Sequence, residues 1–170
     1  MKKYSHEIIN DDTRLQLNFM LTKSDNYYSP LHWHGHLEII FIQKGKMAAY
    51  INDRKYMLKE NDMLVVGSKE LHSTRTWGET DYLLLQIPTE YLSRVLNQVP
   101  LLQFQEYFPS ITRNNSQSGL CHCLLALAET YLNKEDGYLL HFSSVVYEFF
   151  YLLYKNHSHR ISPQAKERGN

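Results

Sequence analysis

The sequence has almost no cysteine, no excess of charge of either sign and no long hydrophobic run. Its 170 residues include 2 cysteines. These are Cys121 and Cys123, two positions apart in a segment with helical periodicity, where they cannot readily bridge each other. We therefore expect free thiols in a reducing compartment and predict that the protein is cytoplasmic.

Long apolar segments are missing as well. The longest, residues 37–42, contains Glu38 and is far shorter than the roughly 20 residues that a membrane-spanning helix needs. The N-terminus begins with Lys2 and Lys3, but no apolar stretch follows them, which argues against a secretory signal. We expect no membrane partner.

Neither charge nor motifs point to nucleic acid or to hydrolysis. The chain has 18 Lys and Arg against 18 Asp and Glu, a formal net charge of zero. Nucleic-acid-binding domains usually carry a basic excess, because phosphate neutralisation supplies much of their affinity. The chain also has no Ser/His/Asp spacing typical of a triad and no phosphate-cradling glycine motif. We expect these residues not to bind DNA themselves.

What the sequence does have is a histidine-rich stretch at residues 32–45. In a strand, side chains alternate between two faces, so His32, His34, His36 and Glu38 are predicted to share one face. Burying such a cluster without partners is costly. It is therefore expected to line a pocket, bind a metal or face water.

Short strands separated by turns fill the rest of the first half. Apolar and polar residues alternate over 14–21, and further short apolar runs follow it, split by turn residues. Within 37–42 both faces are apolar, which predicts a strand buried on both sides. This spacing is typical of a β-sandwich or barrel. We assign residues 1–90 to this barrel, including an N-terminal arm. The further strands are expected at 47–51, 55–58, 63–66, 73–77 and 81–87.

The second half changes to helical periodicity. Apolar residues recur every three or four positions over 118–133 and 139–156, with Asp136-Gly137 as a break between them. The second helix is aromatic around much of its circumference, which leaves apolar surface for a second subunit. The alternative is that the hairpin buries both faces within its own chain. Residues 91–157 form the helical region, with a dimerisation hairpin at about 118–156, and residues 158–170 are predicted to be a linker.

The histidine-rich stretch carries a family resemblance. It resembles the first signature of the cupin superfamily, H-x-H-x(3)-E-x(6)-G, with His32, His34, Glu38 and Gly45 in the four defining positions. The second cupin signature is degraded, but its final histidine is present as His72.

Residues 32–45 and 56–64, and the loop leading to His72, also resemble the sensor domains of AraC-type transcription regulators. The likeness covers roughly residues 13–90, and the hairpin lies where those regulators have their dimerisation helices. The resemblance implies a mainly β fold, a cupin-like (jelly-roll) β-barrel followed by an α-helical hairpin. It further implies a small-molecule effector, for example a sugar-like compound, and a homodimer formed through the C-terminal helices. DNA would be bound only by a separate domain beyond Asn170, with two helix-turn-helix units.

The resemblance leaves the chemistry of the cluster open. Cupin enzymes hold metal at the positions that match His32, His34, Glu38 and His72, a donor set that suits Zn, Ni, Mn or Fe. AraC-type sensors often keep these residues without metal, as the lining of a ligand pocket or in local hydrogen bonds. A structural role is the third alternative. The alternative function is a small metal-dependent cupin enzyme of the dioxygenase or isomerase type.

Two further residues are candidates for the ligand site. His36 follows Gly35, which could allow a bulge that turns its side chain aside. The matching position is commonly aromatic in the resembling sensors, which fits a ligand contact, and a solvated histidine at the barrel mouth is the alternative. Tyr50 could place its hydroxyl in the pocket, although tyrosines in strands are more often packing residues.

Overall fold

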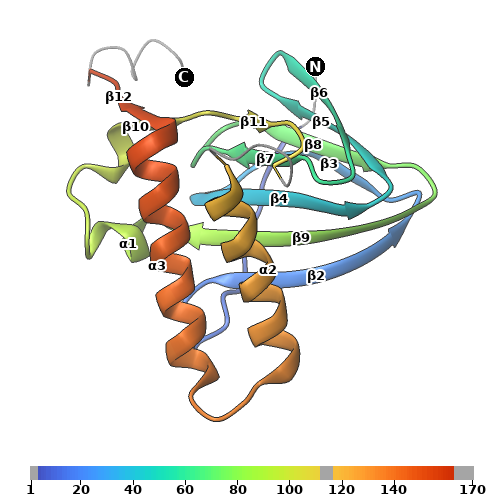
Figure 1. Cartoon of the computed structure of the whole chain (residues 1–170). Helices are drawn as coiled ribbons and strands as arrows, with labels where there is room; N and C mark the ends of the chain where they lie inside the picture. The colour runs from blue at the N-terminus through green and yellow to red at the C-terminus, as the bar shows by residue number, and fades with distance from the viewer. Residues whose placement is uncertain (1–3, 112–116, 163–170) are drawn as a thin grey trace.

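A computed structural model describes residues 4–111 and 117–162 of the chain (Figure 1). These residues contain twelve strands, two α-helices that form a C-terminal hairpin, one short α-helix and one 3-10 helix. The strands are β1 (Ser5–His6), β2 (Asn18–Asp25), β3 (Tyr28–Trp33), β4 (His36–Lys44), β5 (Lys46–Ile51), β6 (Arg54–Lys59), β7 (Met63–Val66), β8 (His72–Thr76), β9 (Glu79–Pro88), β10 (Leu102–Phe104), β11 (Tyr107–Phe108) and β12 (Ser158–Arg160).

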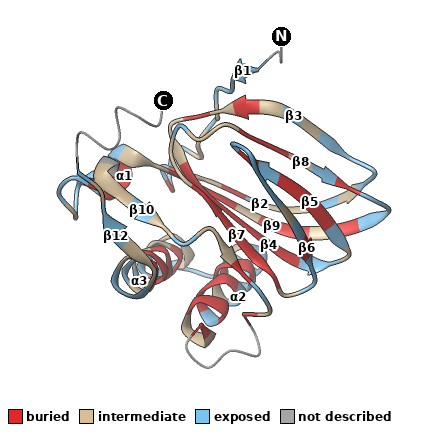
Figure 2. Ribbon diagram, turned by 90° about the horizontal axis from the view of Figure 1, so that it is seen from above, coloured by how far each residue is buried: buried red, intermediate tan, exposed pale blue. Residues whose placement is uncertain are grey.

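Ten of the strands form two facing five-stranded sheets. The open sheet has the order β1-β3-β8-β5-β6, and the helix-covered sheet has the order β11-β7-β4-β9-β2. Figure 2 shows the two sheets from above, with the helices against the outer face of the second. All pairings are antiparallel except that of β1 with β3. This arrangement confirms the mainly β, cupin-like fold with C-terminal helices that the sequence predicts.

Strand β4 is buried on both faces, as predicted. Leu37, Ile39 and Phe41 belong to the apolar core shared with the helices. Ile40 and Ile42 belong to a second core between the two sheets. Because alternate residues of one strand reach both cores, β4 physically connects the space between the sheets with the helical layer.

The helical hairpin consists of α2 (Ser118–Asn133) and α3 (Tyr138–His157), within one residue of the predicted bounds. Gly137 ends the connection with a φ of +77°, a conformation that glycine adopts at little cost. Phe142 packs edge-on against Phe19 of β2, with ring centroids 5.0 Å apart. One face of α3 therefore packs against the helix-covered sheet. The other helices are α1 (Thr89–Ser93) and the 3-10 helix η1 (Val99–Leu101).

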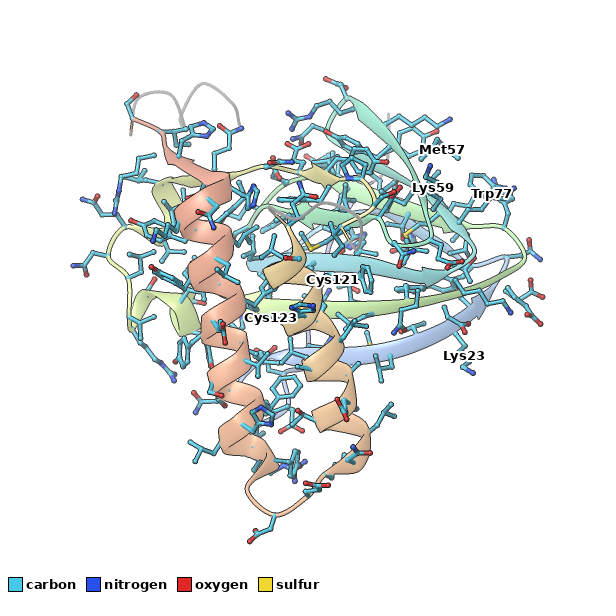
Figure 3. All side chains as sticks on the ribbon, viewed as in Figure 1. Lys23, Met57, Lys59, Trp77, Cys121 and Cys123 are labelled. Carbon is cyan, nitrogen blue, oxygen red and sulfur yellow. The ribbon has the colours of Figure 1, made fainter. Side chains whose placement is uncertain are left out.

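Both cysteines are free and buried in α2, as predicted (Figure 3). Burial raises the pKa of Cys121, and it raises that of Cys123 to about 11. Among the described residues no helix is both long and apolar enough to cross a membrane.

The strand predicted over 14–21 corresponds to β2, which begins later than predicted. Alternation predicts a strand over 14–21, whereas β2 starts at Asn18. The carboxylate of Asp12 accepts hydrogen bonds from the backbone N–H of Arg14 (2.8 Å) and Leu15 (3.2 Å), which closes a turn. Gln16 then takes a φ of +58°. Leu15 and Leu17 still face the core, so the alternation correctly identified the buried residues.

The histidine-rich stretch is not one strand, which corrects the predicted shared face. The chain leaves the open sheet at Trp33, the end of β3, and joins the helix-covered sheet at His36, the start of β4. The turn between them is held by two hydrogen bonds. The backbone N–H of Lys69 donates to the His34 carbonyl (2.8 Å), and the Thr89 hydroxyl donates to the Gly35 carbonyl (2.6 Å).

The segment predicted to be a linker begins with a short strand. β12, residues 158–160, pairs with β10 in a two-stranded sheet, and the backbone N–H of Ile161 donates to the Leu101 carbonyl (2.9 Å). The rest of the predicted linker, 163–170, lies outside the described residues.

Candidate functional site

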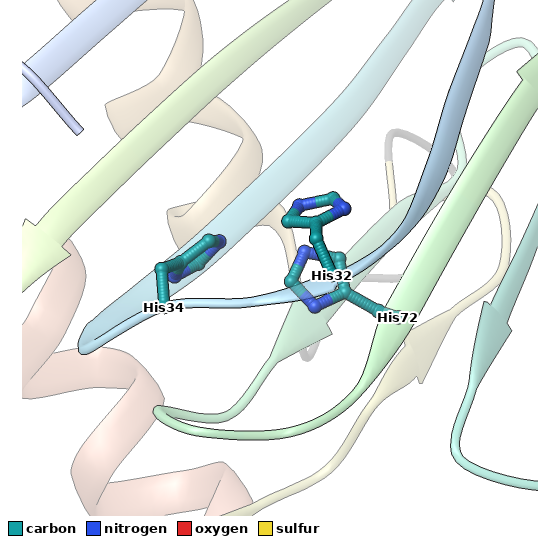
Figure 4. Close-up of side chains that lie close together, drawn as sticks. All are labelled: His32, His34 and His72. Atoms are coloured by element: carbon teal, nitrogen blue, oxygen red, sulfur yellow. The ribbon is translucent and has the colours of Figure 1, made fainter. Parts of the chain in front are cut away.

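Three imidazoles meet between the sheets although they come from separate elements. His32 lies on β3, His34 in the turn that follows it, and His72 at the start of β8 (Figure 4). The ring centroids of His32 and His72 are 4.1 Å apart, and those of His34 and His72 are 4.8 Å apart. One nitrogen of each ring lies within 4.8 Å of the others, and all three residues are buried.

Glu38 supplies the negative charge of this cluster. Its Oε2 accepts hydrogen bonds from His34 Nε2 (3.0 Å) and from the amide of Gln86 (2.7 Å). Gln86 is in turn oriented by Asn18, whose amide donates to Gln86 Oε1 (2.6 Å). Burial by itself raises the pKa of Glu38, but the hydrogen bond from His34 and the electrostatic attraction of His34 and His72 outweigh burial and lower the pKa far below its ordinary value. Glu38 is therefore a buried carboxylate anion.

Backbone contacts fix which nitrogen of each ring carries hydrogen. A carbonyl oxygen can only accept, so the Nδ1 atoms of His32 and His72 must donate to the carbonyls of Pro30 (2.7 Å) and Glu70 (2.9 Å). In the neutral rings, their Nε2 atoms then carry lone pairs. His34 is the reverse case, because its Nδ1 accepts the backbone N–H of His36 at 3.3 Å.

These lone pairs point at carboxylates. His72 Nε2 is buried without a hydrogen-bond partner in the described part of the chain and lies 3.7 Å from Glu38 Oε1. An imidazole lone pair facing a carboxylate calls for a cation between them, either a proton or a metal ion. Metal-bound histidines commonly donate their other ring N–H to a carbonyl, as His32 and His72 do here.

The donor set thus fits a divalent transition metal. The converging nitrogens of His32, His34 and His72 would hold it, with His34 taking the other tautomer and giving up the 3.3 Å contact from His36. Glu38, whose carboxylate lies 3.0 Å from His34 and 3.7 Å from His72, would be the fourth ligand. Bound there, the ion would supply a positive centre for an anionic or oxygen-bearing ligand.

An N-terminal arm, residues 4–13, reaches the cluster from outside. Glu7 Oε2 lies 3.2 Å from His32 Nε2. Burial lowers the pKa of His32, but the hydrogen bond and charge of Glu7 outweigh burial and raise it, while the same hydrogen bond lowers the pKa of Glu7. A second pair lies further along the arm, where Asp11 Oδ1 is 3.2 Å from His36 Nε2.

A cavity of about 570 Å³ opens beside the cluster. Its walls come from both sheets and from the arm, so it lies inside the barrel. The lining mixes apolar side chains with a few hydrogen-bonding groups, as small-molecule sites do. Among the lining residues are His32, Glu38, Ile40, Thr74, Tyr82 and Gln86.

The structure brings together four of the six residues predicted for ligand binding. His32, His34, Glu38 and His72 form the cluster, despite the broken strand. His36 borders His34, with ring centroids 5.8 Å apart, but directs its Nε2 to Asp11 and does not line the cavity.

Tyr50 lies on the outer face of β5, with 41% of its surface exposed and Lys55 over its ring. This corrects its predicted place in the pocket, because odd-numbered residues of β5, such as Met47, face the inside.

Sequence reasoning missed Gln86 and Glu7. Gln86 pairs with Glu38 in the β4–β9 register, and the even-numbered parity that it shares with Tyr82 was the available signal. Nothing in the local pattern marks Glu7, because the arm contacts the barrel only through tertiary structure.

Comparison with known proteins adds two regulator-related matches. A family profile described as AraC-like ligand binding domain matches residues 21–150. A Bacillus subtilis protein, described as the uncharacterized HTH-type transcriptional regulator YdeC, is 30% identical over 74 residues, which is 42% of this chain and 25% of the relative. This chain thus matches about a quarter of the length of that relative.

Solved structures with partial overlap include members of the cupin superfamily. A cupin superfamily protein from Desulfitobacterium hafniense has a TM-score of 0.41 and 18% identity, over 43% of this chain and 68% of that one. A predicted oxalate decarboxylase from Thermotoga maritima has a TM-score of 0.40 and 24% identity, over 43% and 68%. These distant overlaps place no reaction on this chain.

Proposed function

This chain belongs to the AraC-like ligand-binding domain family, and from that premise we propose that it is the effector-sensing and dimerisation domain of an AraC-type transcription regulator. A small molecule, for example a sugar-like compound, enters the barrel cavity beside His32 and Glu38. The proposal divides the chain into a ligand-binding barrel with its arm (1–90), a helical region (91–157) and a linker (158–170). It assigns no catalysis to the domain.

The observation that carries this proposal is the two-sided burial of β4. Glu38 and Ile40 line the cavity, while Ile39 and Phe41 on the same strand pack in the core shared with α2 and α3. A ligand that moves one face of β4 must therefore disturb the packing of the helices on the other face, because cores are close-packed. This is the coupling that a sensor needs.

The hairpin supports the proposed homodimer. Leu125 and Leu132 are exposed on α2, at 47% and 70%, and their spacing of seven residues places them on one face. Leu140 on α3 is 79% exposed. A second copy of the same hairpin would cover these side chains by two-fold symmetry.

DNA binding is proposed for a separate domain beyond Asn170. The balanced charge of this chain supports that division, and so does the match to part of an HTH-type regulator. The proposal predicts that the gene continues past Asn170 into two helix-turn-helix units. It also predicts a cytoplasmic protein, which agrees with two buried free thiols.

Ligand binding in the cavity can be tested with a matched pair of variants. Thr74 and Arg75 are neighbours on β8, but only Thr74 lines the cavity. We expect pentoses, hexoses or aromatic carboxylates to raise the melting temperature of the wild type and of Arg75→Trp, and not of Thr74→Trp, because the indole fills the cavity. Equal stabilisation of both variants would contradict binding in the barrel.

The alternative is a small metal-dependent cupin enzyme of the dioxygenase or isomerase type. The buried Nε2 of His72 favours it, since this atom has no hydrogen-bond partner among the described residues and is a ready metal ligand. Elemental analysis of untagged protein, combined with chromatography of the bound compound, separates the two functions. Conversion of that compound by metal-containing protein would establish the enzyme. Unchanged compound, bound equally well after chelation, would exclude it.

A further inference from the structure

The N-terminal arm carries a carboxylate into the histidine cluster. β1 is the edge strand of the open sheet and pairs with β3, and the backbone N–H of Glu7 donates to the Trp33 carbonyl (2.9 Å). From there, residues 7–10 pass along the cavity and form part of its wall. The side chain of Glu7 is 46% exposed, so the arm reaches the cluster from the solvent side.

The contact between Glu7 and His32 brings two electron-pair donors together. His32 Nε2 carries a lone pair in the neutral ring, because its Nδ1–H is committed to the Pro30 carbonyl. Glu7 Oε2 lies 3.2 Å from that nitrogen. The same situation recurs inside the cluster between His72 and Glu38. A proton on His32 would satisfy only the first pair, whereas one divalent cation can serve both.

The spacing is that of ligands on a common metal ion. Two donors at about 2.1 Å from one ion and at right angles to each other lie about 3 Å apart. The Glu7–His32 distance is 3.2 Å and the Glu38–His34 distance is 3.0 Å. Glu7 and Glu38 together also bring two negative charges, which balance a divalent cation among neutral imidazoles.

We propose that Glu7 is a metal ligand supplied by the N-terminal arm, next to His32, His34, Glu38 and His72. A divalent transition metal then fastens the arm to the barrel and fixes one wall of the effector cavity. The metal thereby controls access to the cavity. The inference deepens the proposed function and rests on its cavity, but it concerns the metal and the arm alone.

Asp11 provides the matched control. It lies on the same arm and also pairs with a histidine, but its partner His36 stands outside the set of converging nitrogens. Glu7→Gln and Asp11→Asn each replace one carboxylate by its isosteric amide. Both positions are partly exposed, which leaves the core untouched.

The experiment titrates Co²⁺ and Zn²⁺ into metal-free protein by calorimetry and follows hydrogen exchange of residues 4–13. We expect the wild type and Asp11→Asn to bind with equal affinity and to show slower exchange in the arm once metal is bound. Glu7→Gln is expected to bind at least about 10-fold more weakly, without protection of the arm.

Three results would overturn the inference: equal metal affinity in Glu7→Gln and wild type, faster exchange of the arm on metal binding, or no binding of either metal by the wild type. None of these three results would contradict the proposed sensing function. That function is decided separately by the stabilisation of wild type, Thr74→Trp and Arg75→Trp with sugars and aromatic carboxylates.

Discussion

At the level of single residues, Glu38 organises the site. One of its oxygens accepts from both His34 and Gln86, and the other faces the lone pair of His72. Its carboxylate is buried, so these partners depend on it as their acceptor. Removing the acceptor and removing only the charge should therefore have different consequences.

Glu38→Ala is expected to cost about 3 kcal/mol or more of unfolding free energy. It leaves the donors of His34 and Gln86 unpaired, and each buried unpaired donor costs about 1–3 kcal/mol. Glu38→Gln keeps an oxygen for both donors and offers an amide N–H to His72 Nε2, so we expect a change within about 1 kcal/mol. Urea denaturation measures both, and equal losses in the two variants would contradict this assignment of roles.

His157 is expected to make the stability of the protein depend on pH. Burial lowers its pKa below the ordinary value of about 6.5, and its Nε2 is buried without a hydrogen-bond partner among the described residues. The unfolded chain then binds the proton more readily than the folded one. The contribution of neutral His157 to the free energy of unfolding is therefore fully present above pH 6.5 and is lost as pH falls through the lowered pKa.

Replacing His157 should therefore make the free energy of unfolding depend less on pH. The free energy of unfolding of wild type, compared with that of His157→Phe, is expected to fall between pH 7.5 and pH 5. Denaturation at several pH values measures the difference. A difference that stays constant, or that grows toward acid, would show that His157 is not responsible.

Some of these residues were predictable and others were not. The cupin-like spacing identified His32, His34, Glu38 and His72 directly. Gln86 escaped because its role depends on lying opposite Glu38 in the sheet register, 48 positions away in sequence. One sequence does not specify which strands are neighbours.

At the level of elements, the turn after β4 depends on a glycine. Gly45 has a φ of +85°, and a Cβ there would lie 2.5 Å from the Glu79 carbonyl oxygen and 2.9 Å from Thr80 Oγ1. β4 and β9 approach each other closely at this end. A side chain at this position would thus face both an unfavourable backbone conformation and a collision.

Gly45→Ala should consequently destabilise the protein more than Gly78→Ala. Gly78 also has a positive φ, +63°, but an added Cβ there would meet no atom within 4 Å. We expect about 1 kcal/mol for Gly78→Ala from conformation alone and at least about 1 kcal/mol more for Gly45→Ala. Thermal or chemical denaturation gives the comparison, and equal costs would argue against the close approach.

The exposed Leu125 and Leu132 of α2 are expected to lie in the proposed dimer interface. Replacing Leu125 and Leu132 by lysine places two charges in the proposed interface without touching the buried side of the helix. We expect the double variant to be monomeric at concentrations where wild type is dimeric, as measured by sedimentation velocity. Met57→Lys, at an exposed position on β6, is the matched control and should remain dimeric. A dimeric double variant would exclude this face.

Helical periodicity and alternation predicted the elements well where the apolar pattern was long. α2 and α3 have the predicted bounds within one residue, and β4 has the predicted two buried faces. Alternation failed at residues 33–36, where the chain changes sheets. The reason is tertiary, since Lys69 and Thr89 hold the turn from distant segments.

On the scale of the whole molecule, β4 lies between the barrel cavity and the helical layer. The cavity lies between the two sheets, and the hairpin covers the outer face of the sheet to which β4 belongs. Fold and cluster were predictable from the signature residues, whereas the cavity and the arm along it required the structure. We propose that a small molecule bound in the barrel changes the packing of the hairpin through β4.

Methyl NMR of the isoleucine side chains tests this claim most directly. Ile40 lines the cavity, and its neighbour Ile39 lies in the core shared with the helices. Titration with pentoses, hexoses and aromatic carboxylates is predicted to shift both methyl signals together for at least one compound, in the wild type and not in Thr74→Trp. If no compound shifts Ile40, or if Ile40 shifts while Ile39 stays unchanged, the claim is contradicted.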